Sequence, residues 1–141
     1  RETYLPLLRE KPGAVRATFV DGRFFDLGRP VDLLAANSAL LREPGAFSFI
    51  RDGLTARAEG VWISPFAAVD ETAQLHGPLI VAPHAQVGAH AVVGPETTVG
   101  AGAIVAPHSR LERCLVWEKT PVDGAFADEI LTPDHRVRAH G

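Results

Sequence analysis

A six-residue repeat fills the second half of this chain and constrains its fold more than any other feature. Every sixth residue in it is large and apolar, and the residue four positions after each large one is usually small. A helix cannot produce this pattern, because six does not fit a 3.6-residue period and the Pro and Gly density would break a helix. The repeat predicts one short strand and one tight turn in each hexad, with an inward aliphatic side chain. From residue 63 to residue 117 every sixth residue is large and apolar: Ile63, Val69, Leu75, Val81, Val87, Val93, Val99, Val105, Leu111 and Trp117.

Three such hexads form one triangular coil, and each coil hydrogen-bonds to the next, so that the aliphatic columns form one continuous core. Proline at the third hexad position suits a tight turn and occurs four times, as Pro65, Pro83, Pro95 and Pro107. The repeat resembles the hexapeptide family of left-handed parallel β-helices. Left-handedness is what this resemblance implies, since periodicity alone does not give it.

Composition excludes several classes of protein. The chain is 46% hydrophobic and 22% charged with a net charge of −3, which is typical of a globular protein rather than a disordered one. It has no apolar run of the ~20 residues that span a bilayer, and no basic block that would favour nucleic acid. A single cysteine, Cys114, excludes an internal disulfide and a cysteine-rich zinc site. With no secretory signal, these features favour a cytoplasmic protein.

The first sixty residues follow a different pattern. Residues 14–27 are predicted to form a β-hairpin around Asp21-Gly22. Pro30 suits the first turn of a helix of about a dozen residues that ends at Pro44-Gly45. A lone two-stranded ribbon is marginal in water, so this part resembles the end of a domain whose body lies elsewhere. The chain also begins with Arg1 and lacks methionine, and we expect it to belong to a longer protein.

We therefore expect four segments: a domain remnant with its linker helix over 1–43, a connector over 44–60, the β-helix over 61–122 and a C-terminal cap over 123–141. The connector is expected to hold a short strand around Phe47, Phe49 and Ile50. The cap is expected to hold a hairpin, with strands at 130–132 and 136–138 and Pro133-Asp134-His135 as its turn.

Residues 24–37, with the sequence Phe-Phe-Asp-Leu-Gly-Arg-Pro-Val-Asp-Leu-Leu-Ala-Ala-Asn, resemble a known segment. It is the Trp-x-Asp-(Ile/Val)-Gly-Thr-Pro…Ala-Asn stretch near the end of the catalytic domain in sugar-1-phosphate nucleotidyltransferases, especially the mannose-1-phosphate guanylyltransferase-like members. In that family the segment leads through a helix into a left-handed β-helix. The residues Tyr4-Leu5-Pro6-Leu7-Leu8 also resemble a stretch just upstream. Here Phe24 or Phe25 stands in place of the Trp, and Arg29 in place of the Thr.

This resemblance implies that Asp26 helps to hold the Mg²⁺ that bridges the phosphates in the complete enzyme, since Mg²⁺ takes one or two carboxylates from protein. The alternative is that Asp26 is a loop acceptor that caps the helix beginning at Pro30, or its turn. The family's Gly-rich phosphate loop does not occur in these residues. We therefore expect no catalytic residue, no cofactor-binding residue and no bound cofactor in this chain by itself, and no turnover without the missing catalytic domain.

Three histidines offer a different chemistry. His90 and His108 are 18 residues apart, so they should stack at the same turn position of adjacent coils, and His84 takes that position at another corner. Hexapeptide acyltransferases use a coil histidine as general base, and gamma-class carbonic anhydrases bind zinc through such histidines. The alternative is that all three are solvated turn residues, because histidine tolerates a positive φ better than most. Cys114 is expected at a turn as a partly exposed thiol.

An apolar outward stripe marks the remaining candidate surface. Stepping by 18 from Trp62, it contains Trp62, Ile80, Thr98 and Val116, in a span whose only formal charge between residues 72 and 109 is Glu96. Such a stripe predicts either self-association into a homo-oligomer or cover by the chain's own helix or tail. The family resemblance of residues 24–37 implies that this chain is the assembly or regulatory module of a nucleotidyltransferase that makes an NDP-sugar. A hexapeptide acyltransferase and a non-catalytic scaffold are the alternatives.

Overall fold

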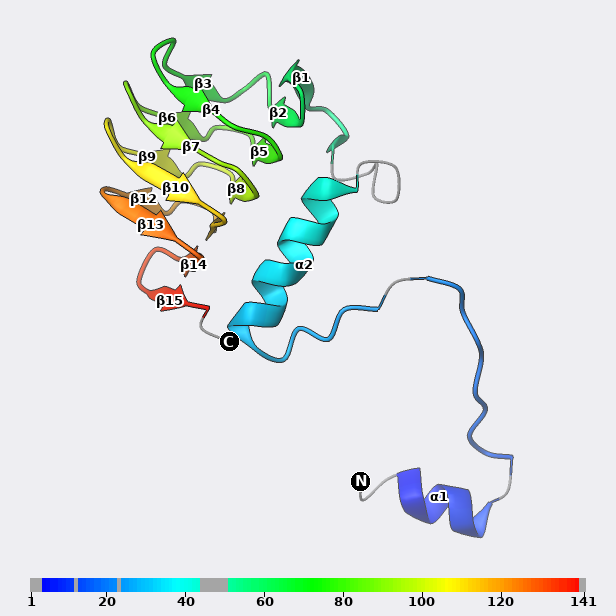
Figure 1. Cartoon of the computed structure of the whole chain (residues 1–141). Helices are drawn as coiled ribbons and strands as arrows, with labels where there is room; N and C mark the ends of the chain where they lie inside the picture. The colour runs from blue at the N-terminus through cyan, green and yellow to red at the C-terminus, as the bar shows by residue number, and fades with distance from the viewer. Residues whose placement is uncertain (1–3, 12, 23, 44–50, 140–141) are drawn as a thin grey trace.

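Short strands alternate with turns along most of the chain and wind into a parallel β-helix (Figure 1). The computed structural model describes residues 4–11, 13–22, 24–43 and 51–139. Its helices are α1 (Tyr4–Glu10) and α2 (Pro30–Arg42). Its strands are β1 (Thr55–Ala58), β2 (Val61–Ile63), β3 (Ala68–Val69), β4 (Gln74–Leu75), β5 (Leu79–Val81), β6 (Gln86–Val87), β7 (Val92–Val93), β8 (Thr97–Val99), β9 (Ile104–Val105), β10 (Arg110–Glu112), β11 (Leu115–Val116), β12 (Pro121–Val122), β13 (Ala125–Ala127), β14 (Glu129–Leu131) and β15 (Arg136–Arg138).

Three sheets form the sides of the β-helix. Sheet A has the order β1-β2-β5-β8-β11-β14-β15, sheet B the order β12-β9-β6-β3, and sheet C the order β13-β10-β7-β4. Pairing is parallel between successive coils, with Val81 opposite Val99 for example. Sheet A alone carries an antiparallel strand at each end, β1 against β2 and β15 against β14. The fold expected from the hexads is therefore confirmed as a parallel β-helix.

The core follows the predicted columns. Val81, Val93 and Val99 are completely buried, and Val105 and Leu111 are 1% exposed. The small residues four positions after each large one fill the corners, where Ala85, Ala91, Thr97, Ala103 and Ser109 are all buried. Each coil thus closes around one aliphatic layer, which packs on the layers above and below.

The turns explain why small and permissive residues recur. His84, His90, Glu96 and His108 all take a positive φ between 53° and 62° at the same hexad position. Gly94 has a φ of +100°, and a Cβ there would lie 1.9 Å from the carbonyl oxygen of His76 on the preceding coil. The stacked backbones are therefore too close at this corner for any side chain.

The hexad register ends at Leu111, and the prediction that Trp117 points inward is wrong. Val116, not Trp117, is opposite Val99, and the intervening turn is one residue shorter than the others. Arg113 takes the positive φ of that turn. Val116 is accordingly 1% exposed and Trp117 49%. Val116 and Trp117 are both large and apolar, so either could take the inward position of the six-residue repeat. The repeat alone therefore could not reveal the shortened turn.

The β-helix also continues beyond residue 122, where the predicted boundary lay. β13 pairs with β10, with Phe126 opposite Leu111, and β14 pairs with β11. Turns of different lengths separate these last strands, so their inward residues do not recur every six positions. The predicted cap hairpin is confirmed, because β14 and β15 pair antiparallel with Ile130 opposite Val137.

The N-terminal predictions have different outcomes. Helix α2 is confirmed, with Pro30 in its first turn. The hairpin predicted over 14–27 is wrong, since the described residues of this range contain no strand and run as an extended segment away from the β-helix (Figure 1). With no sheet to pack on, a ribbon has little to stabilise it. The strand expected near Phe47, Phe49 and Ile50 lies outside the described residues.

Candidate functional site

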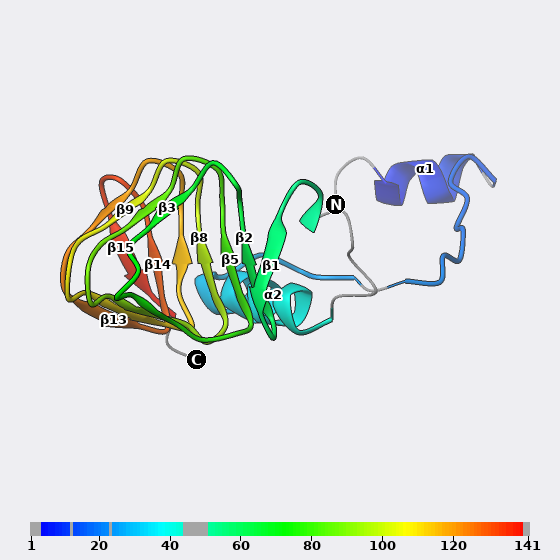
Figure 2. The ribbon, with the colours of Figure 1, turned by 90° about the horizontal axis from the view of Figure 1, so that it is seen from above.

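Helix α2 lies lengthwise along sheet A, antiparallel to the direction in which the coils progress (Figure 2). Its first turns lie beside the last coil, where Val31 and Leu34 share a hollow with Asp128. Its last turn lies beside the first coils, where Leu41 shares a hollow with Pro78. The helix therefore brings the segment before it to the C-terminal end of the β-helix.

Two polar contacts anchor α2 to the β-helix, one at Asn37 near its middle and one at Arg42, its last residue. The hydroxyl of Thr98 donates to Oδ1 of Asn37 over 2.7 Å. The guanidinium of Arg42 binds the carboxylate of Glu96, from the turn before β8. Burial raises the pKa of Glu96, but hydrogen bonds from Arg42 and Ser38 outweigh it, so that the pKa lies below its usual value. Glu96, the lone charge of its span, is thus part of the α2 interface.

The predicted outward stripe lies under this helix. Ile80 is 8% exposed, and Trp62 and Thr98 are half-buried on the outer face of sheet A. Val116 does not belong to the stripe, because it lies in the core, and Leu115 takes the outward place opposite Thr98. Of the two alternatives for this face, cover by the chain's own helix is the one observed.

Asp26 lies exposed in the extended segment that precedes α2. The helix begins after Arg29, and no side chain provides a capping hydrogen bond there. Arg29 pairs instead with Asp32 of the first turn, which holds the pKa of Asp32 below its usual value. Asp26 therefore does not cap the helix. Its exposed carboxylate suits Mg²⁺ as one ligand, and the remaining ligands would have to come from outside the described residues.

A histidine corner, defined here as Asp70, Thr72, His90 and His108, lies between sheets B and C. The rings of His90 and His108 stack with centroids 5.2 Å apart, and both side chains are exposed. The backbone N–H of His90 donates to the Thr72 hydroxyl, which donates to Oδ1 of Asp70 over 2.5 Å. Hydrogen bonds from the hydroxyl and the backbone N–H of Thr72 hold the pKa of Asp70 below its usual value. The predicted stacking of the two histidines is confirmed.

The other two predicted positions differ in outcome. His84 is exposed at the corner between sheets A and B, 5.9 Å from the ring of Phe66. Cys114 is completely buried, which corrects the expectation of a partly exposed thiol. The shortened turn moves it into the small inward position that Thr97 occupies one coil earlier. Burial raises the pKa of its thiol, so it is not suited to act as a nucleophile.

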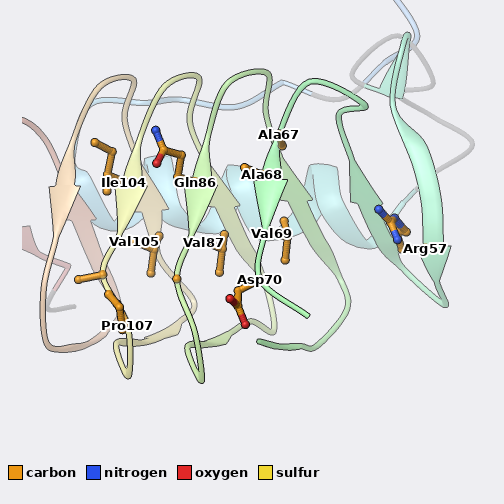
Figure 3. A pocket seen from close by; sticks show the side chains of 12 residues that line it. Arg57, Ala67, Ala68, Val69, Asp70, Gln86, Val87, Ile104, Val105 and Pro107 are labelled. Atoms are coloured by element: carbon orange, nitrogen blue, oxygen red, sulfur yellow. The ribbon is translucent and has the colours of Figure 1, made fainter. Parts of the chain in front are cut away.

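Sequence reasoning missed a groove along sheet B (Figure 3). It measures about 580 Å³ and crosses three coils. Its lining includes Gly88, Ala106 and Pro107, from the turns that lead from sheet B to the histidine corner, and the outward residue Ile104. Arg57 of β1 lies at one end (Figure 3). The signal was available, since the outward residues of these strands are uncharged, but only the coil geometry shows that they form a hollow.

Within the described part of the chain, no group of three or more His, Cys, Asp or Glu side chains is placed to hold a metal ion. None of its helices has the length and apolar character required to cross a membrane.

No family model matches the chain, and no curated protein does. Among solved structures, the acetyltransferase domain of PglB from Neisseria gonorrhoeae FA1090 is 25% identical, with a TM-score of 0.44 over 45% of this chain and 32% of that one. The same domain in complex with acetyl coenzyme A is 14% identical, with a TM-score of 0.33 over 57% of this chain and 58% of that one. The chain thus spans less than two thirds of either structure.

Proposed function

We propose that the chain is the β-helix module of a sugar-1-phosphate nucleotidyltransferase, which joins an NTP and a sugar 1-phosphate to give an NDP-sugar and pyrophosphate. In this proposal the segment before α2 completes the catalytic domain, and α2 fastens that domain to the β-helix. The module itself serves assembly or regulation.

One contrast carries this proposal. Helix α2 is anchored along sheet A, yet the segment just before it exposes large apolar side chains, with Phe19 100%, Val20 86% and Phe24 89% exposed. A sequence with strand composition whose apolar residues are exposed is expected to be buried against another structure. The nucleotidyltransferase-like motif of residues 24–37 spans this boundary, with its Asp in the exposed part and its Asn on the anchored helix.

In the complete enzyme Mg²⁺ would neutralise charge on the reacting phosphates. Asp26 would supply a carboxylate to hold it. The β-helix would instead fix the position of the catalytic domain.

Acyl transfer is the second candidate, and the position of the groove favours it. A histidine corner directly beside an elongated groove is the arrangement in which a bound acyl thioester could meet a general base. His90 would accept the proton of an acceptor amine as the nitrogen attacks the thioester carbonyl. The C–S bond would then break, and the proton would pass to the departing thiolate. Acetyl transfer is also the activity named for both solved structures.

We expect the isolated chain to release no pyrophosphate from any NTP and sugar 1-phosphate, because it has no Gly-rich phosphate loop. A coupled pyrophosphate assay tests this, and measurable release above the no-enzyme blank would contradict it. The same preparation, offered acetyl coenzyme A and an amino sugar, tests the second candidate. Thiol release that is lost in His90→Ala and kept in His84→Ala would establish acyl transfer in place of the main proposal.

A homo-oligomer remains part of the proposal, but the contact has to lie elsewhere than sheet A, whose outer face α2 covers. The outward residues of sheet B are Ala68, Gln86, Ile104 and Pro121, all exposed and uncharged. Because these outward side chains carry no charge, they can meet a second copy of themselves without leaving a charge of their own unpaired.

We therefore expect light scattering at micromolar concentration to show an oligomer that Ile104→Glu dissociates, since Ile104 is 49% exposed at the centre of this face. Arg110→Glu, on the outer face of sheet C, is the matched control and should leave the mass unchanged. A monomeric wild-type chain across the same concentrations would contradict the expectation.

A further inference from the structure

The direction of α2 determines at which end of the β-helix the rest of the protein must lie. The chain enters α2 beside the last coil, where Val31, Leu34 and Ala35 share a hollow of about 210 Å³ with Asp128 and Ala139. It leaves α2 beside the first coils. Because α2 is anchored at both ends and at Asn37, the segment up to Arg29 emerges only at the C-terminal end.

The exposed apolar residues lie close to this exit in sequence. Leu27 is three residues before Pro30 and Phe24 six, so at ~3.3 Å per residue even Phe24 lies within about 20 Å of the start of α2. Whatever buries Phe24 and Leu27 must therefore lie next to the last coil. The opposite end, where Phe66 is exposed on the first coil, is separated from this exit by the length of α2.

The surface at the C-terminal end has room for such a contact. The hollow beside Val31 and Ala35 continues the interface that α2 already makes with the β-helix. Strand β15 forms the outer edge of sheet A, with Val137 37% exposed on it. Arg138 is paired with Glu129, and Arg136 beside it is exposed, which suits a partner surface that carries carboxylates.

We propose that the C-terminal hairpin β14–β15 and the first turn of α2 form the docking surface for the domain that residues 14–27 complete. This rests on the proposed function only in naming that domain as the catalytic one. The first coil, at the other end of the β-helix, faces away from it. Asp26 would then lie at the junction of the two domains, so that the C-terminal cap borders the catalytic site.

Photocross-linking in the complete protein tests the placement. Benzoylphenylalanine is introduced at Val137 on the cap or at Phe66 on the first coil, both exposed positions, and melting temperatures verify that each variant folds. After irradiation, cross-linked peptides are identified by mass spectrometry. We expect Val137→benzoylphenylalanine to cross-link to peptides of the domain that precedes α2, and the Phe66 variant to give no such peptide.

Cross-links to that domain from position 66, or none from position 137, would overturn the placement. A pyrophosphate assay on the same complete protein tests the proposed function separately. A domain that docks at the cap but releases no pyrophosphate would refute the proposed function and leave the docking surface standing. An active protein that cross-links only from position 66 would refute the docking surface and leave the proposed function standing.

Discussion

Val93→Asp is expected to unfold the β-helix at a temperature well below that of the wild type. Val93 is completely buried, and its neighbours in the stacked column, Leu75 and Leu111, offer no group that could pair with a carboxylate. An uncompensated buried charge costs about 3–5 kcal/mol, a large share of the 5–15 kcal/mol that stabilises a typical domain. Because each coil contacts only its neighbours, the loss at this layer should separate the coils on either side.

The adjacent residue provides the control. Val92 lies on the same strand and points outward, opposite Arg110 of the next coil. Val92→Asp introduces the same charge where water and Arg110 can solvate it, so we expect a change within about 0.5 kcal/mol. Thermal and chemical denaturation, both followed by circular dichroism, give the unfolding temperature and the free energy of unfolding of each variant. An equal loss in the two, or an unchanged Val93→Asp, would mean that the aliphatic columns do not face inward as described.

The part of the fold that was predictable from the sequence is the part in which the coils repeat without change. Between Ile63 and Leu111 each hexad has the same length, so that one large residue in six identifies the core. The pattern fails at Arg113, where the turn loses a residue and Arg113 pairs with Asp128 of the next coil over 2.6 and 2.8 Å. Neither the shortened turn nor that pairing leaves a periodic signal.

The two predicted hairpins show how context decides between similar local signals. Both have strand-forming residues around a turn. The one near residue 134 forms because its first strand, β14, already pairs with β11 of the coil before it. The one over 14–27 has no such template within the described residues, and its apolar side chains remain exposed. Sequence propensity located both segments, but only a neighbouring sheet could order one of them.

The candidate sites were predictable to a similar extent. The spacing of 18 placed His90 above His108 correctly, because both occupy the same turn of consecutive coils. The cover of the outward stripe by α2 was not predictable, since nothing in the hexads specifies which face of the β-helix α2 covers. That choice depends on particular contacts, namely Asn37 to Thr98 and Arg42 to Glu96, between residues more than fifty positions apart.

Asp26→Asn in the complete enzyme is expected to lower kcat by about 100-fold or more, the scale of losing one strong electrostatic stabiliser. The substitution keeps the size of the side chain and its capacity for hydrogen bonds, but removes the charge that a divalent metal requires. If Asp26 acts on the reacting phosphates, the loss should appear in turnover rather than in folding. Metal-free melting temperature should hardly change, because Asp26 is exposed and makes no capping bond to α2.

Asp32→Asn is the control that separates this role from a structural one. Asp32 is the nearest carboxylate in sequence after Asp26, and it pairs with Arg29 at the start of α2. Its loss should weaken the first turn of the helix and leave kcat close to the wild-type value. A helix-capping role for Asp26 predicts the opposite result, with about 1 kcal/mol of stability lost and activity nearly kept. Retained activity in Asp26→Asn would therefore exclude a metal-binding role, and with it the one residue that links this chain directly to phosphate chemistry.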